Sequence, residues 1–386
     1  WVSGSVLGLC PFFGFGRPGG GGLVVWAPAP PPHCPNPRCA FHCEPTGWRW
    51  VKDGFYGRQR DPRRVQRYRC RHCRRRFSDQ TFRLTYWLQR PRLLRPVFHA
   101  LLACSAYRQI ARALETSPGT VLTHAARLGR HALLFHQQRR PRVLPDEPLV
   151  LDSFESFEYS HYHPTLFHVA AGQQSHFFHG FTASERRRSG RMTERQKRRR
   201  AVLEARHGRP DPRAIEHDVA TLLAVLAPAP RRLELHSDEH SDYPRALRRL
   251  PHLEVAHHTI SSRAARTPRN PLFPVNLIDL LIRHSSANHK RETIAFSKRR
   301  QSAIDRLWVL VVWRNYLKSF SERARGESPA MRLGVLKRRL RAAEVLGARL
   351  FPERIGLPPC WRRYYRRAVE TREIPRCARH RLKYAW

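Results

Sequence analysis

The amino-acid sequence predicts a mixed α/β protein, because apolar segments of strand length alternate with helical ones in the middle of the chain. Three such segments, bounded by Gly, Pro, Ser and Asp, precede a helical apolar spacing at Ile215–Leu226. Two more follow it, with a shorter helical spacing at Tyr243–Leu250 between them. The expected strands cover residues 149–159, 165–172, 175–183, 231–238 and 253–261.

Charge restricts the class of partner more than length does. The 386 residues include 72 Lys and Arg against 30 Asp and Glu, a formal net charge of +42. Self-repulsion of this size is tolerated when a polyanion neutralises it, so we expect a nucleic-acid partner and not a small neutral substrate. No run of 18 apolar residues occurs, so we expect no membrane-spanning helix. Nine cysteines, several spaced as metal ligands, favour a reducing compartment, and we expect a cytoplasmic, nucleoid-associated protein.

Changes of composition divide the chain into parts. The N-terminus is rich in Gly and Pro and is expected to be a disordered or non-native leader. Beyond residue 275 the pattern is helical, with expected helices at 276–284, 303–320 and 331–350. The expected parts are the leader at 1–32, a zinc ribbon at 33–85, a helix-turn-helix at 86–140, an α/β core at 149–325 with a basic insertion at 184–214, and a helical C-terminal section at 326–386.

Two pairs of cysteines predict a zinc site. Zn²⁺ takes four thiolate or imidazole ligands at tetrahedral corners, and two cysteine turns on neighbouring hairpins can supply them without a large core. The second pair, within YRCRHCRRRF, has close spacing, while the first is looser, so that Cys43 or His42 could replace one of its members. The predicted zinc ligands are Cys34, Cys39, Cys70 and Cys73.

The cysteine region also predicts DNA binding. Residues 46–95 contain 16 Lys and Arg against three acids, interleaved with Trp, Phe and Tyr. Such cations neutralise phosphates, although a charged segment is also typical of a merely solvated surface. The candidate DNA-binding residues of the second cysteine turn are Arg71, Arg74, Arg75 and Arg76.

Two short helical patterns around Thr116-Ser117-Pro118 outline a helix-turn-helix. Ser117 can cap the second helix, and Pro118 suits its first position. A plain helical hairpin has the same pattern, so the alternative stays open. The candidate groove-facing residues are Gly119, Thr120, Thr123 and His124.

Two acids follow apolar strands in this very basic chain. Asp152 ends the run PLVLD, and Asp238 ends RRLELHSD. Two carboxylates brought together repel each other, and a bound divalent cation such as Mg²⁺ or Mn²⁺ relieves that repulsion. Two such ions can activate a water or a 3′-hydroxyl for phosphoryl displacement. The alternative is that both are ordinary strand-end turn residues.

The order of these features resembles the bacterial insertion-sequence transposases of the RNase H-like DD(E/N) superfamily, in the branch with an N-terminal zinc ribbon and helix-turn-helix. The family's order is met by the knuckle CRHCRRRFS, the helix-turn-helix, the strand LDSFE, then HSDEHSDY and NPLFPVNLIDLLIRHSSANHKRETIAFSKRR, over roughly residues 33–320. The resemblance implies an RNase H-like mixed sheet, strand-end catalytic carboxylates, metal-dependent strand transfer and a DNA substrate.

The third catalytic ligand is where the sequence departs from the family pattern. The resemblance implies a helical Glu or Asn with a Lys or Arg seven residues on, on the same helix face. Asn276 with Arg283 meets this spacing and is the preferred candidate, with Arg283 expected to contact substrate phosphate. Asp279 lies on the same face and would be the better ligand electrostatically. Glu292 also has a basic residue at the right spacing but comes late in the chain.

A further basic segment lies in the expected insertion, where residues 186–200 include nine Lys and Arg. We expect it to follow a DNA strand by phosphate contacts, or else to be a solvated loop. The sequence as a whole favours a DNA transposase that binds element ends and target DNA as a homo-oligomer and cleaves and joins strands. The alternatives are a catalytically inactive, transposase-derived DNA-binding regulator, and an RNA-binding scaffold or nuclease.

Overall fold

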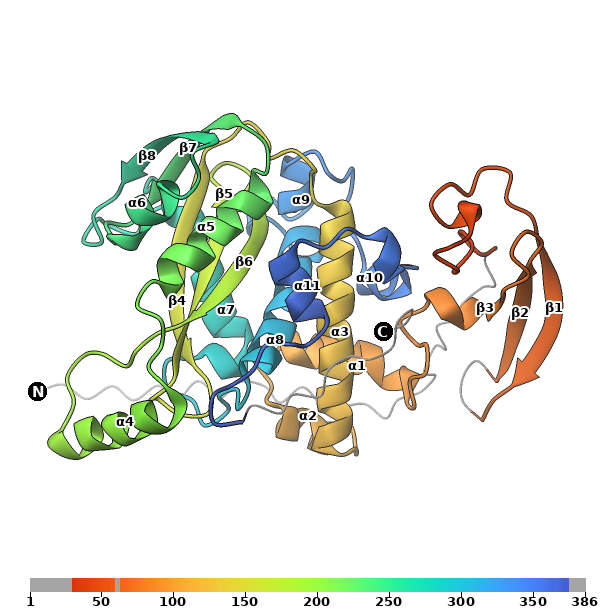
Figure 1. Ribbon diagram of the computed structural model, residues 1–386, viewed down its shortest axis with the longest axis horizontal. Helices are drawn as coiled ribbons and strands as arrows, with labels where there is room; N and C mark the ends of the chain where they lie inside the picture. The colour runs from red at the N-terminus through yellow and green to blue at the C-terminus, as the bar shows by residue number, and fades with distance from the viewer. Residues whose placement is uncertain (1–29, 60–62, 375–386) are drawn as a thin grey trace, which may run out of the picture.

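The computed structural model describes residues 30–59 and 63–374, so nearly all of the expected leader lies outside the described residues. A small antiparallel sheet of three strands, in the order β1-β2-β3, stands at one end of the molecule (Figure 1). A larger sheet and a group of helices form the rest. The strands of the small sheet are β1 (Trp50–Gly57), β2 (Arg64–Cys70) and β3 (Arg76–Ser78).

The larger sheet has five strands in the order β6-β5-β4-β7-β8. Strand β5 runs antiparallel to its neighbours β4 and β6, while β7 and β8 run parallel to β4. This order and these directions are those of an RNase H-like mixed sheet, so the expected fold class is confirmed. The strands are β4 (Leu149–Phe157), β5 (Pro164–Gly172), β6 (Phe178–Glu185), β7 (Arg231–Ser237) and β8 (Leu253–Thr259), and each overlaps an expected one.

Helices cover both faces of this sheet. On β4, Ser153 contacts Tyr243 of α6, whereas the neighbouring Phe154 packs against His289, which follows α7. Successive strand residues point to opposite faces, so α6 and α7 lie on opposite sides of the sheet. The expected helices at 215–226 and 243–250 are present as α5 and α6. The bounds are α5 (Ala214–Leu226), α6 (Asp242–Leu247), α7 (Phe273–Ser285) and α8 (Arg300–Val312).

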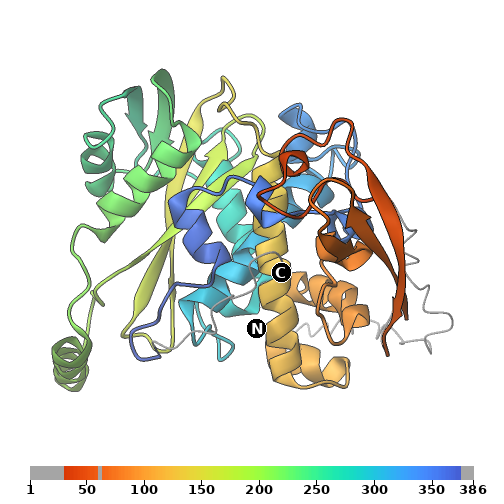
Figure 2. The ribbon, with the colours of Figure 1, turned by 45° about the vertical axis from the view of Figure 1, so that its right-hand side comes forward.

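The expected helix-turn-helix segment packs onto this core. Helix α3 runs beside α8 (Figure 2), and the two backbones are so close that a Cβ at Gly129 would lie 2.5 Å from the carbonyl oxygen of Asp305. One apolar cluster extends from Leu84 to Val369, so the helices before β4 share the core of the large sheet. The helices are α1 (Leu94–Leu102), α2 (Tyr107–Ala113) and α3 (Pro118–Arg139), preceded by the 3₁₀ turns η1 (Ala40–His42), η2 (Asp79–Phe82) and η3 (Pro91–Leu93).

The C-terminal section is helical but more broken than expected. The prediction of a single helix at 331–350 is wrong, because the chain leaves helical geometry at Gly334, where φ is +75°. None of the helices in the described ranges is long and apolar enough to cross a membrane. The remaining elements are α4 (Glu194–His207), η4 (Ala287–His289), the π-helical turn η5 (Trp313–Leu317), α9 (Pro329–Arg332), α10 (Ala342–Gly347), η6 (Pro352–Arg354) and α11 (Pro359–Tyr365).

Candidate functional site

Asp152 and Asp238 lie level with each other on neighbouring parallel strands. Leu149 of β4 pairs with Leu235 of β7, and Val150 pairs with His236. Continuing this register by two residues brings Asp152 opposite Asp238, which directly follows β7. The buried residues 149–151 precede Asp152, which lies within β4 and not at its end as expected, because the strand continues to Phe157, whereas Asp238 lies at the C-terminal end of β7. Backbone N–H groups of Ser153 and His240 donate to the two carboxylates, at 2.7 and 3.1 Å.

Helix α7 brings a third acid to this place. Burial and then the charge of Asp152 raise the pKa of Asp279 to about 7, against the opposing effects of Arg283 and Arg266. The pKa of Asp152 is raised to about 6 by burial and by the charge of Asp238, while the hydrogen bond from the Ser153 N–H and the charge of Arg266 oppose the shift. Asp152 is therefore subject to repulsion from Asp238 and in turn repels Asp279, within one partly buried region.

The other two candidates for the third position differ in their surroundings. Asn276 is half-buried one turn before Asp279 on α7, on the same helix face. Glu292 is exposed in the irregular segment between η4 and α8, outside any helix. The Arg283 guanidinium lies 5.9 Å from the ring centroid of Phe154, and its Nη1 donates to the His289 carbonyl at 3.1 Å.

Sequence reasoning missed several polar groups around these acids. Arg266, in the loop after β8, acts on the pKa of both Asp152 and Asp279. The Tyr243 hydroxyl is 3.0 Å from Ser153 Oγ, and burial, followed by the charges of the three acids, raises the pKa of Tyr243 well above 10. Ser153 Oγ in turn lies 2.6 Å from Nδ1 of the buried His168. A loop arginine and isolated Tyr and His residues carry no sequence pattern that would have identified them.

The donor set of the three acids suits a hard divalent cation. Carboxylate oxygens are the ligands that Mg²⁺ and Mn²⁺ prefer, and burial of Asp152 and Asp279 raises the pKa of each, so that a bound cation would favour their ionised forms. The carboxylates are not tightly bunched. In residues 30–59 and 63–374, the cysteine cluster is the one group of three or more His, Cys, Asp or Glu side chains whose ligand atoms all lie within 4.8 Å of one another.

That cysteine cluster consists of the four predicted ligands, Cys34, Cys39, Cys70 and Cys73. The Sγ atoms of Cys34 and Cys73 are 3.5 Å apart, close to the edge of about 3.8 Å expected for sulfurs about 2.3 Å from a tetrahedral zinc. Trp48 Nε1 donates to Cys70 Sγ at 3.2 Å, as in the outer contacts that orient metal ligands. Cys43 is exposed and outside the cluster. The four thiols fit Zn²⁺.

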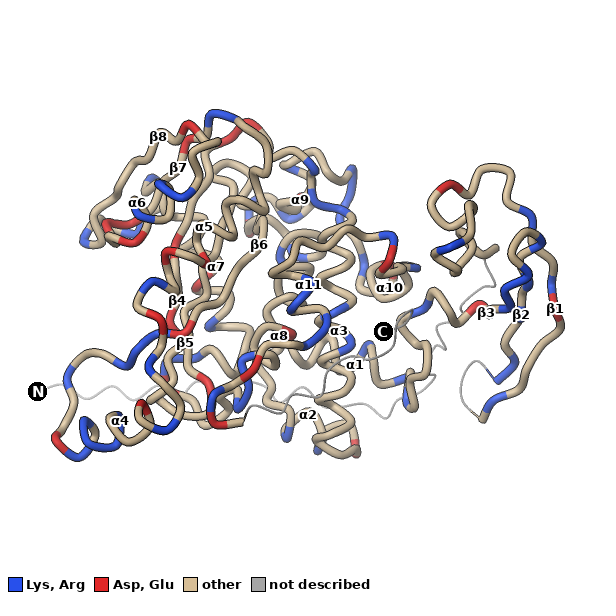
Figure 3. The backbone as a smooth tube through the Cα atoms, viewed as in Figure 1, with Lys and Arg blue, Asp and Glu red and all other residues tan. Residues whose placement is uncertain are grey.

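The arginines after this cluster are exposed on the small sheet, where cations are dense along the strands (Figure 3). Arg71, Arg74 and Arg75 extend from the second cysteine turn, and Arg74 has a left-handed backbone, with φ at 59°. Arg76 is also exposed but forms an ion pair with Asp53 at 2.8 Å. The surface they form remains a predicted DNA contact.

At the helix-turn-helix, the predicted cap is present, since Ser117 Oγ accepts from the Thr120 N–H at 3.1 Å. Gly119 and Thr123 are exposed at the start of α3, and Thr120 is half-buried. His124 points inward instead. It is 1% exposed, and its ring nitrogens lie 2.8 Å from the carbonyl oxygens of Thr120 and Arg90, so it is not placed to face a groove.

Comparison with known proteins adds little to this geometry. No protein-family model matches the chain, and no curated protein matches it. One similar solved structure is described as a cryo-EM structure of the simian T-cell lymphotropic virus intasome in complex with PP2A regulatory subunit B56 gamma. The sequences are 13% identical, the match covers 68% of this chain and 76% of that chain, and the TM-score is 0.26. A likeness this slight carries no argument, so the fold assignment rests on the strand order.

Proposed function

We propose that the protein is a DNA transposase, a metal-dependent polynucleotidyl transferase that cleaves and joins DNA strands. The observation that carries the proposal is that Asp152 of β4 interacts electrostatically both with Asp238, which follows the adjoining strand β7, and with Asp279 of α7, in a sheet with the RNase H-like strand order. The small sheet with its cysteine-held Zn²⁺ and the start of α3 would recognise the element ends. We assign the third ligand position to Asp279 in place of Asn276, because Asp279 interacts electrostatically with Asp152.

The three carboxylates would hold Mg²⁺ or Mn²⁺, which supplies Lewis acidity and an ionised oxygen nucleophile when bound. The surrounding side chains define the rest of the chemistry. Arg266 and Arg283 place positive charge beside the acids, where a substrate phosphate would approach. Tyr243 is buried, and its raised pKa keeps the hydroxyl protonated, so it is a poor nucleophile for a covalent protein–DNA intermediate.

A strand-transfer assay with Mg²⁺ or Mn²⁺ tests the proposal. The substrate is a duplex carrying the inverted repeats that flank the coding region, and the wild type is compared with Asp152→Asn. We expect joined product from the wild type and a loss of more than about 100-fold in the variant, with DNA affinity unchanged. Equal inertness of both proteins, with DNA binding intact, would instead identify a DNA-binding regulator. Preference for structured RNA over duplex DNA would identify an RNA-binding protein.

A further inference from the structure

Helix α4, in the insertion between β6 and α5, carries arginines along one flank. Arg195, Arg198, Arg199 and Arg206 are exposed. Their spacings from Arg195, of 3, 4 and 11 residues, place them on the same side of an α-helix at 3.6 residues per turn. From Arg195 to Arg206 the row is about 16 Å long, at about 1.5 Å per residue. We call these four residues the arginine flank.

The side of α4 that carries Arg200 and Glu204 is directed at the protein. Arg200 donates to the Arg188 carbonyl at 2.9 Å, and Leu203, the one buried side chain of the helix at 5% exposed, lies between this side and the arginine flank. Glu204 accepts two hydrogen bonds from Arg187, at 2.8 and 3.1 Å. These contacts fix which side of α4 faces the body, so the arginine flank is held outward.

The acids of this segment do not neutralise the arginine flank. Glu204 pairs with Arg187 and Arg200, and Glu194 pairs with Lys197. Across the described part of the chain, none of the four flank arginines has an ion-pair partner. A row of like charges on a helix with one buried side chain destabilises that helix, unless a polyanion covers it.

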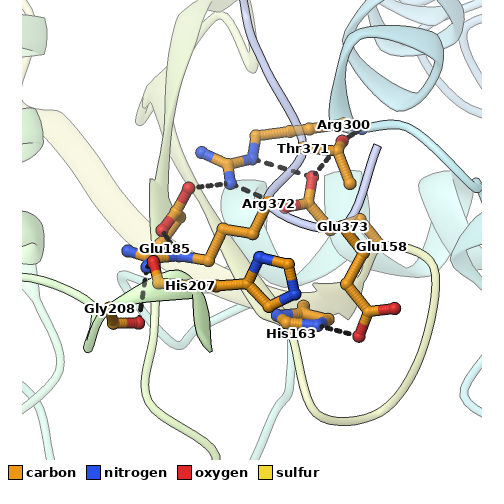
Figure 4. A network of polar contacts seen from close by, with 9 residues as sticks. All are labelled: Glu158, His163, Glu185, His207, Gly208, Arg300, Thr371, Arg372 and Glu373. Atoms are coloured by element: carbon orange, nitrogen blue, oxygen red, sulfur yellow. Dashed lines mark hydrogen bonds and ion pairs between the residues drawn. The ribbon is translucent and has the colours of Figure 1, made fainter. Parts of the chain in front are cut away.

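The C-terminal end of α4 is linked to the large sheet by hydrogen bonds and an ion pair from segment 371–374 (Figure 4). Nη1 of Arg372 donates to the carbonyl oxygens of His207 and Gly208, at 2.7 and 2.6 Å, and the same guanidinium pairs with Glu185 at the end of β6. A cation bound to the last carbonyls stabilises a helix C-terminus. Helix α4 is therefore held in a defined orientation, and the basic segment is not a loose loop; we call this helix the arm.

Helix α4 lies beyond the sheet that carries the candidate site, on the side where β4 and β6 end and β5 begins (Figure 1). Asp152 lies five residues before the end of β4, about 17 Å along the strand. A duplex rises about 3.4 Å per base pair, so DNA lying at the three acids and along this direction would reach the end of β4, on the side where α4 lies, after roughly five base pairs.

We propose that the arginine flank binds the backbone phosphates of duplex DNA beside the strand-transfer site, and that Arg372 fixes its orientation. The inference rests on the proposed function for the identity of the DNA at the three acids. Binding of DNA by the arginine flank does not require strand-transfer activity, so this inference and the proposed function can be tested and rejected separately. A catalytically inert protein whose DNA affinity depends on the flank would leave this inference standing.

The test measures binding of a fluorescent duplex to the full chain at several salt concentrations. For Arg195→Ala/Arg199→Ala we expect at least about 10-fold weaker binding at physiological salt, and a slope of log affinity against log salt that is smaller by about 2. The matched control is Arg323→Ala/Lys337→Ala, which removes two exposed charges from the C-terminal section and should change affinity less than about twofold. The proposal would be overturned if the flank variant and the control variant weakened duplex binding equally. It would also be overturned if the flank variant bound duplex DNA normally and lost only the binding of a structured RNA.

Arg372→Lys tests the anchor separately. Lysine keeps the positive charge but cannot donate to two carbonyls and a carboxylate with the same fork. We expect faster amide hydrogen exchange in Glu194–His207 and an affinity between those of the wild type and the flank variant. Unchanged exchange in α4 would show that Arg372 does not orient the arm.

Discussion

The carboxylate of Asp152 on β4 acts on that of Asp279 on α7, whose pKa burial and this charge raise to about 7. The two residues are 127 positions apart, and it was the family resemblance, not the local sequence pattern, that made both of them candidates for one site. The carboxylates of Asp152 and Asp279 repel each other, which is unfavourable unless a cation lies nearby. Because functional sites concentrate such perturbed groups, this pair is the best place to test the proposed metal site.

The choice between Asp279 and Asn276 can be decided by substitution. Asp279→Asn should abolish strand transfer, by more than about 100-fold, and remove most of the thermal stabilisation given by Mg²⁺. In the metal-free protein at pH 8 the same change should raise the free energy of unfolding by about 1–2 kcal/mol, because it removes a partly buried repulsive charge. Calorimetry with and without Mg²⁺ measures both effects.

Asn276→Ala is the matched control on the same helix face. We expect it to retain the Mg²⁺-induced rise in Tm and to lose less than about 10-fold in activity. The assignment of Asp279 would be wrong if Asn276→Ala lost the metal response and Asp279→Asn kept it.

Stability should depend on pH with a definite sign. Asp152 and Asp279 have folded pKa values of about 6 and about 7, above the ordinary 3.8. The folded metal-free protein therefore binds more protons than the unfolded chain between about pH 4 and 7, and these two groups lower the free energy of unfolding as pH rises through that window. Divalent ions need the ionised carboxylates, so the Mg²⁺-induced rise in Tm should be small at pH 5.5 and large at pH 8.

Thermal melts at pH 5.5, 6.5, 7.5 and 8, with Mg²⁺ and with chelator, measure this dependence. Asp279→Asn should flatten the part of the metal-free curve between pH 6 and 7. A Mg²⁺ response of equal size at pH 5.5 and pH 8 would contradict the coupling of ion binding to these carboxyl groups.

The cysteine cluster predicts one zinc ion per chain. Cys70→Ser should lose that ion and unfold the small sheet, because Cys70 ends β2 and two further members of the cluster precede β1. Cys43→Ser changes an exposed thiol outside the cluster and should retain the metal. Elemental analysis of the purified proteins measures the zinc content, and calorimetry measures the unfolding of the small and the large sheet. Retention of a full equivalent of zinc in Cys70→Ser would exclude this cluster as the site.

The sequence predicted those features that depend on local pattern. Apolar segments identified the five strands, and cysteine spacing identified the four clustered thiols, whereas Gly334 interrupted a helix that apolar periodicity made continuous. The seven-residue spacing to Arg283 favoured Asn276 but could not separate it from Asp279, since both lie on one face of α7. Arg266 lies in a loop of a chain in which nearly one residue in five is basic, so no pattern distinguished it.

Contacts between distant parts of the chain were beyond sequence reasoning. Arg372 caps a helix that ends 165 residues earlier, and Glu158 meets Arg300 across 142 residues. Both contacts use residue types that are abundant on any charged surface, and only the folded geometry shows that the second pair is buried. The same limit applies to His124, whose position on α3 suggested a groove-facing residue before its contacts were known.

A buried ion-pair network joins the C-terminal segment to the sheet, and we expect substitutions in it to lower the free energy of unfolding strongly (Figure 4). The Arg300 guanidinium donates to both oxygens of Glu158, at 2.7 and 3.1 Å, and to Glu185 at 2.5 Å. Thr371 Oγ1 donates to Glu158 at 3.0 Å. Arg300→Met leaves the Glu158 carboxylate buried without its cation, so we expect a loss of about 3–5 kcal/mol in the free energy of unfolding.

The exposed pair of Arg186 with Glu155, at 3.1 Å, gives the comparison. Arg186→Ala should change the free energy of unfolding by less than about 1 kcal/mol, because solvent screens this pair. The double variant Arg300→Met/Glu158→Gln should recover part of the loss, since it removes the uncompensated charge. Denaturant unfolding of the four proteins measures these differences. If Arg300→Met and Arg186→Ala cost the same, or if the double variant recovered nothing, desolvation of Glu158 would not be the cause.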